Sequence, residues 1–184
     1  NFKKRILVVG EGPGQLEDEN NKPWQGRTGR LLQKTFRRLG VDLFEDCISV
    51  NAVNCRPVDK HGENRTPTTH EIDCCRKSVL DVIDMHKPNL IILLGQSALV
   101  SLIGYRWKKE LDTISRWRGF TIPDQDYKAW LCPTFHPSYV ERNDGQEITT
   151  IWETDLTEAF KLINTPIKKY RQPEIEIITD LKPI

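Results

Sequence analysis

The sequence lacks several features that would each indicate a class of protein. No apolar run reaches the roughly 18 residues of a membrane-spanning helix, and the sequence shows no signal-peptide pattern. The net charge of +1 gives no excess of either sign, so charge alone does not indicate a nucleic-acid partner. The five cysteines are odd in number and do not have the spacing of a disulfide framework, which predicts a reducing, cytoplasmic location.

What the sequence does contain is an alternation of apolar strands and amphipathic helices. Strands are expected at 5–9, 47–53, 90–94, 118–122 and 128–132, and helices at 31–39, 68–83, 97–103 and 147–163. This alternation predicts a mostly parallel sheet covered by helices on both faces. We expect one domain over 1–166, with 167–184 as an extension or a linker toward a possible further domain of a longer polypeptide.

Unusual polar and aromatic side chains follow three of the expected strands. The glycine-rich loop after the first strand carries Glu11, Glu17 and Trp24, the second loop carries Asn51, and the last carries His136. The carboxyl ends of parallel strands lie at one edge of a sheet, where ligands bind in α/β folds. We therefore expect these side chains to converge on one pocket.

The combination suits a flat heterocycle attached to a sugar. A tryptophan can stack on the ring face, and an asparagine can offer a donor and an acceptor to the ring edge. A histidine can stabilise charge that develops on a carbonyl oxygen, and a carboxylate can position water. The set fits cleavage of the bond between a base and its sugar.

Each residue also has a simpler interpretation. Glycine-rich loops after strands usually bind nucleotide phosphates, although this loop lacks the Lys-Ser/Thr of a P-loop and carries acidic residues. Asn51 could form a turn, Trp24 could be part of the core, and His136, which precedes a proline, could be structural. A nucleotide-binding α/β domain therefore stays open as an alternative.

Taken in order, the motifs resemble those of the family 4 uracil-DNA glycosylases. The resemblance covers about residues 5–143 and rests on GEGPGQLED (10–18), SVNAVNCRP (49–57), NRTP (64–67), IILLGQSA (91–98) and TFHPSYVERN (134–143). It implies a three-layer α/β/α fold with a central four-stranded, mostly parallel sheet and a uracil pocket at the strand ends.

The resemblance also implies roles for the residues that carry it. Glu11 and Glu17 would place or polarise the attacking water and face the sugar. Trp24 stands where the family has a stacking phenylalanine, and Asn51 would read the uracil edge. His136 would hydrogen-bond uracil O2 as the base leaves as an anion.

Further positions are assigned by the same resemblance. Gly12 would let the backbone approach the substrate, and Asn64 would line the pocket. On the DNA side, Ser138 and Arg142 would contact the backbone, and Val140 would push into the duplex.

The family normally holds a [4Fe–4S] cluster on four cysteines. Cys55 and Cys75 match the last two ligand positions, and the first two would precede the first strand, outside this sequence. The positions of Cys47, Cys74 and Cys132 do not match cluster ligands. Whether a cluster is present therefore stays open, and no divalent metal is expected in the chemistry.

Two departures from the family pattern concern the surface that would face DNA. Glu141 replaces an apolar residue, and an acid there is expected to weaken the approach to phosphate. An insertion at 60–63 lengthens the loop that would border DNA.

The sequence thus predicts a DNA repair glycosylase that flips uracil out of single- or double-stranded DNA and releases it, leaving an abasic site. The alternative is a non-catalytic DNA- or uracil-binding module of the same fold within a larger replication protein, such as a phage DNA polymerase.

Overall fold

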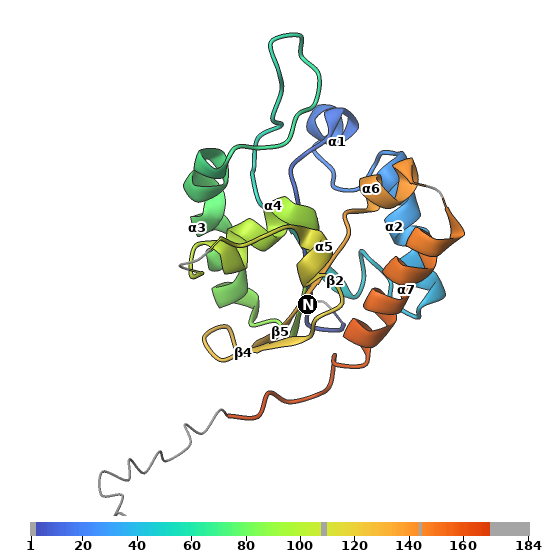
Figure 1. The fold of residues 1–184 in the computed structure, drawn as a ribbon, viewed down its shortest axis with the longest axis vertical. Coiled ribbons are helices and arrows are strands. Elements are labelled where there is room, and N and C mark those ends of the chain that lie inside the picture. Colours follow the sequence, from blue (N-terminus) through green and yellow to red (C-terminus); the bar gives the residue numbers. More distant parts are fainter. Residues whose placement is uncertain (1–2, 108–109, 144, 170–184) are drawn as a thin grey trace, which may run out of the picture.

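A five-stranded sheet in the order β2-β1-β3-β5-β4 forms the centre of the fold (Figure 1). The structure, a computed structural model, describes residues 3–107, 110–143 and 145–169. Strands β2, β1, β3 and β5 are parallel, and the edge strand β4 is antiparallel to β5. The strands are β1 (Ile6–Gly10), β2 (Cys47–Asn51), β3 (Leu90–Leu94), β4 (Ile122–Asp124) and β5 (Ala129–Thr134).

Helices cover both faces of this sheet, with α3 and α4 on one side and α2 and α7 on the other (Figure 1). Within the described ranges, no helix combines the length and the apolar character needed to cross a membrane. The helices are α1 (Gln15–Asn20), α2 (Arg27–Arg38), α3 (Thr69–His86), α4 (Gly95–Leu99), the π-helical turn η1 (Val100–Gly104), α5 (Ile114–Trp117), α6 (Pro137–Arg142) and α7 (Gln146–Phe160).

The central strands β1 and β3 are apolar throughout because both of their faces are buried. Alternate residues of β1 point to opposite layers, as the period of a strand requires. Ile6 and Val8 pack with α2 and α7, whereas Leu7 and Val9 pack with α3 and α4. The three-layer α/β/α fold predicted from the sequence is confirmed, with β4 as a fifth strand at the edge.

Three local expectations were wrong: the bounds of one strand, and the loops expected where two short helices lie. The strand expected at 118–122 starts only at Ile122, after the short helix α5, because Arg118 turns toward helix α7 instead of joining the sheet. The short helices α1 and α6 lie where loops were expected, since six residues are too few to show an apolar period. Of the expected C-terminal extension, residues 170–184 lie outside the described part of the chain.

A buried carboxylate ties helix α7 to strand β5. The side chain of Asp155 is 4% exposed and accepts hydrogen bonds from Thr134 Oγ1 at 2.8 Å and from Arg118 Nε at 2.8 Å, with a second Arg118 contact through Nη2. A buried charge held by such partners becomes costly when one partner is lost. This group therefore holds α7 against the sheet edge next to the strand that leads to His136.

We expect Asp155→Ala to lower the free energy of unfolding by about 3 kcal/mol, because Arg118 and Thr134 lose a shared buried acceptor. Glu153→Ala serves as the control, because Glu153 lies on the same helix as Asp155 and forms a more exposed ion pair, with Arg38 of α2. Its loss should cost less than about 1 kcal/mol. Urea denaturation of both variants measures the difference. Equal losses would show that the buried carboxylate contributes no more to the free energy of unfolding than the exposed one.

Candidate active site

A pocket of about 430 Å³ opens at the carboxyl ends of the parallel strands. It is lined by side chains from the loops after β1, β2 and β5, which the sequence predicted to converge. Of the predicted site residues, the pocket contains Glu11, Gly12, Glu17, Trp24, Asn51, Asn64, His136, Ser138 and Arg142.

Trp24 forms a fixed wall of this pocket. Its side chain is almost completely buried, its Nε1 donates a hydrogen bond to Ser49 Oγ at 3.0 Å, and its backbone oxygen accepts one from Gln33 Nε2 at 2.9 Å. The φ angle of +60° places its backbone in the left-handed region, which a bulky residue adopts only when its surroundings enforce it. Trp24 is thus both a core residue and part of the pocket lining, so the two interpretations of this residue are not exclusive.

Asn51 is the last residue of β2 and lies directly opposite Gly10, the last residue of β1. A Cβ atom on Gly10 would lie 2.5 Å from Asn51 Oδ1 and 3.0 Å from Trp24 Cη2, so only glycine leaves room for both side chains. The Asn51 amide has no hydrogen-bond partner among the described residues. Its donor and its acceptor are therefore both available to a ligand.

The two carboxylates of the first loop have different environments. Glu11 Oε2 accepts a hydrogen bond from Ser97 Oγ at 2.7 Å, and Ser97 is buried on α4. Glu17 Oε1 accepts hydrogen bonds from the backbone N–H groups of Gln25 at 2.8 Å and Gly26 at 2.9 Å. Glu17 therefore closes the loop that carries Trp24, and each of the two carboxylates keeps one oxygen without a hydrogen-bond partner among the described residues.

Sequence reasoning gave Ser97 no role, although it belongs to the GQSA motif after β3. A serine in a helix gives no sequence signal of a functional role. Only the structure, in which α4 lies next to the first loop, shows that the Ser97 hydroxyl reaches Glu11.

His136 lies at the end of β5 as the N-cap of helix α6, and its Nδ1 accepts a hydrogen bond from the backbone N–H of Ser138 at 3.2 Å. The Ser138 hydroxyl lies 2.8 Å from the same nitrogen. Burial, and next the charge of Arg142, lower the pKa of His136 to about 4. At neutral pH the ring is therefore neutral, and because Nδ1 accepts the Ser138 N–H, the proton is on Nε2.

Val140 does not lie where the sequence predicted a wedge that enters DNA. It is 2% exposed and packs into the core beside Phe36 and Trp152, so that prediction is wrong. The physical reason is helix α6: it turns Val140 inward, while Ser138 and Arg142, four residues apart, line the pocket.

The exposed large apolar side chain of α6 is Tyr139, whose ring lies 4.7 Å from that of Phe135. Glu141, two residues further along α6, pairs with Arg27 and accepts a hydrogen bond from Thr28 Oγ1 at 3.0 Å. Its charge is therefore compensated by α2, so the acid is not an isolated negative charge at this surface.

The profile of the Uracil DNA glycosylase superfamily matches residues 1–160. The chain belongs to this superfamily. A type-4 uracil-DNA glycosylase of Thermotoga maritima is 38% identical over 163 residues, which are 89% of this chain and 80% of the relative. A type-4 uracil-DNA glycosylase of Pyrobaculum aerophilum is 36% identical over 144 residues, 77% of this chain and 70% of the relative. These matches confirm the resemblance that the motifs indicated.

A different kind of relative is a DNA polymerase of Bacillus phage SP01. It is 26% identical over 164 residues, which are 89% of this chain but only 16% of the polymerase. The region similar to this chain is therefore a small part of that DNA polymerase.

The cysteines of this superfamily member do not by themselves make an iron–sulfur site. All five are free, and within the described residues no group of three or more cysteine, histidine or acidic side chains could hold a metal ion. Cys55 is exposed, and Cys75 is partly buried against the small apolar cluster of Ala52, Val53 and Ile72. A [4Fe–4S] cluster requires about four thiolates. All five cysteines of the sequence lie in its described part, so the other two thiolates of such a cluster would have to come from outside this sequence.

The neutral state of His136 can be measured by nitrogen-15 NMR, with His136→Gln to assign the signal. We expect a neutral ring with its proton on Nε2 and a titration midpoint near pH 4. Because the unfolded chain takes up this proton at higher pH, the free energy of unfolding should fall as pH drops from about 6.5 to about 4. A midpoint above 6, or a proton on Nδ1, would contradict the assignment.

Proposed function

We propose that this chain removes uracil from DNA by hydrolysing the N-glycosidic bond, which gives free uracil and an abasic site. The observation that carries the proposal is a single pocket lined by Glu11, Trp24, Asn51 and His136. These residues come from different segments of the chain, and each offers a group that this reaction needs.

The flipped base would lie against Trp24 with its edge toward Asn51. The amide of Asn51 can donate to uracil O4 and accept from the N3–H group. Cytosine presents the reverse pattern, a donor at position 4 and an acceptor at N3, so its polar groups would be left unpaired. A site that recognises polar groups in this way discriminates strongly against the wrong base.

Cleavage breaks the bond between C1′ and N1, and the electron pair goes to the uracil ring. The charge that develops on uracil O2 is stabilised by the Nε2–H group of neutral His136. The sugar becomes oxocarbenium-like, which the free oxygen of Glu11 stabilises. Water then adds to C1′ and gives its proton to Glu11. Glu17 supports this chemistry by holding the loop that carries Trp24.

The proposed substrate is uracil-containing DNA, single- or double-stranded. A shallow groove on the outer face of α2 is lined by Arg30, Gln33, Lys34, Arg37 and Arg38. The first turn of the same helix lines the pocket through Thr28 and Gly29. This cationic groove, together with Arg142 at the pocket, supports binding of a polyanion, and such contacts offset the few kcal/mol that base flipping costs.

We also propose a cofactor, a location and domain bounds for this chain. Cys55 and Cys75 would supply two of four ligands to a [4Fe–4S] cluster, and five free thiols favour a reducing, intracellular location. The glycosylase domain would cover 1–166, with 167–184 as an extension or a linker.

A second candidate is a non-catalytic DNA- or uracil-binding module within a replication protein. It is favoured by the phage DNA polymerase, in which the matching region is a small part of the chain. The presence of Glu11, Asn51 and His136 in one pocket favours the enzyme.

Incubation with an oligonucleotide containing one uracil, followed by alkali, separates the two candidates. The enzyme yields a broken strand, and Asn51→Asp should abolish this product because the carboxylate no longer donates to uracil O4. Asn54→Asp is the matched control, since Asn54 follows in the same loop but bonds Ser78 on α3. A uracil strand that is bound but never cut would favour the module.

The donor at uracil O2 is tested separately. His136→Ala should lower the single-turnover excision rate about 10²- to 10³-fold, the usual cost of one lost oxyanion donor. Affinity for uracil-containing DNA should change little, because this hydrogen bond strengthens only as the charge develops. His70→Ala, which changes an exposed histidine near the start of α3, is the control. A variant at full rate would remove His136 from the mechanism.

A further inference from the structure

The segment 57–66 between β2 and α3, here called the arm, projects from the body of the protein beside α1 (Figure 1). Its two legs pair with each other through a bridge between Val58 and Asn64 and hydrogen bonds from Arg65 N to Pro57 O at 3.1 Å and from Asp59 N to Glu63 O at 2.9 Å. The base of the arm lines the pocket through Pro57, Asn64, Arg65 and Thr66. The arm is thus a folded-back hairpin that forms one wall of the active site.

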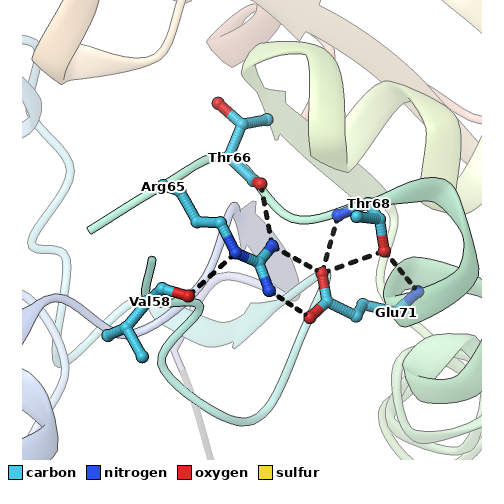
Figure 2. A network of polar contacts seen from close by, with 5 residues as sticks. All are labelled: Val58, Arg65, Thr66, Thr68 and Glu71. Carbon is cyan, nitrogen blue, oxygen red and sulfur yellow. Dashed lines mark hydrogen bonds and ion pairs between the residues drawn. The ribbon is translucent and has the colours of Figure 1, made fainter. Parts of the chain in front are cut away.

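One guanidinium joins both legs of the arm to helix α3 (Figure 2). Arg65 Nε donates to Val58 O at 2.9 Å on the outgoing leg, and Nη1 donates to Thr66 O at 3.1 Å on the returning leg. Nη1 and Nη2 also donate to the two oxygens of Glu71 at 2.8 and 2.6 Å. This fork-to-fork pairing fixes orientation as well as distance.

Glu71 is itself held by the helix on which it lies. It occupies the first turn of α3, where its Oε2 accepts from Thr68 N at 2.7 Å, while Thr68 Oγ1 accepts from Glu71 N at 3.2 Å. The capping box formed by Thr68 and Glu71 therefore has a second use, because the capping carboxylate also accepts hydrogen bonds from Arg65. Arg65, first, and then Thr68 lower the pKa of Glu71 to about 2, so its charge is lost only as pH falls through that value.

The residue whose position depends most directly on this contact is Asn64, the neighbour of Arg65 in the pocket wall. Its Oδ1 accepts a hydrogen bond from Arg56 Nε at 2.6 Å, and Arg56 Nη2 also reaches Gly62 O at 3.1 Å. Asn64 Nδ2 lies toward the glycine-rich loop of the pocket, 4.0 Å from where a Cβ atom on Gly14 would be. Because Asn64 is part of the arm, the direction of this donor depends on the position of the arm.

We propose that Glu71, which does not line the pocket, is a positioning residue for it: through Arg65 it fixes the arm, and with the arm the donor group of Asn64. The inference rests on the proposed function and deepens it. Misplacement of a pocket group by about 1 Å can cost on the order of 10²-fold in rate. The effect of Glu71 should therefore appear in the rate of excision and not in DNA affinity.

Glu71→Gln separates the clamp from the helix cap, because glutamine also completes a capping box. It cannot offer two anionic acceptors to Arg65. Arg65→Lys keeps the charge and removes the fork. Asp81→Asn is the matched control, since it breaks the ion pair between Lys77 and Asp81 on the same helix, away from the arm. Uracil excision is measured under single-turnover conditions, with the affinity for DNA and the melting temperature of each variant.

We expect Glu71→Gln and Arg65→Lys to lower the maximal excision rate about tenfold or more, with affinity within twofold of the unmodified chain and a melting temperature like that of Asp81→Asn. A rate equal to that of the control, or a loss confined to affinity or to melting temperature, would overturn the proposal.

Hydrogen exchange of the Asp59 and Arg65 amides, measured without DNA, tests the arm independently of catalysis. Faster exchange in Glu71→Gln but not in Asp81→Asn supports the clamp, and unchanged exchange overturns it. If the unmodified chain excises no uracil, the proposed function fails, and the exchange result still decides whether Glu71 holds the arm.

Discussion

The close approach at the ends of β1 and β2 is the constraint on which the pocket depends. Gly10 and Asn51 are paired in register, and the space that a side chain on Gly10 would fill is occupied by the Asn51 amide and the Trp24 ring. Pairing continues past the strands, from Ala52 N to Gly10 O and from Val53 N to Glu11 O. The sheet itself thus brings together the group proposed to read a base edge and the ring proposed to cover its face.

The loops around the pocket are ordered mainly by side chains that bond to backbone. Glu17 accepts hydrogen bonds from two N–H groups of the segment that precedes α2, and Arg65 donates hydrogen bonds to two carbonyl groups of the arm. Ser97 holds one oxygen of Glu11 from below. Groups fixed in this way need little reorganisation during a reaction, which is the condition for effective electrostatic stabilisation. The ionised residues near the pocket therefore serve largely to hold its walls.

The sequence predicted the layers of the fold and most of the pocket because both follow from local patterns. A five-residue apolar run such as 90–94 is short for a helix and fits a strand buried on both faces, and the polar residues that follow parallel strands share one edge. Val140 could not be placed correctly, since its direction depends on helix α6, which has no apolar period. The pairing of Arg65 with Glu71 was also missed. Glu71 lies in the first turn of α3, and nothing in the sequence spacing shows that the loop before this helix folds back onto it.

The electrostatics of His136 favour a neutral donor both before and after a substrate binds. The main cause of its lowered pKa is burial, and the charge of Arg142 is a secondary cause. In the proposed complex a phosphate near Arg142 would weaken the secondary cause, but a base in the pocket would exclude water and strengthen the main one. The imidazole therefore stays neutral. Because the Ser138 N–H donates to Nδ1, the imidazole proton stays on Nε2. A neutral donor stabilises the leaving base without a proton transfer that would later have to be reversed, so one histidine can return unchanged to each new substrate.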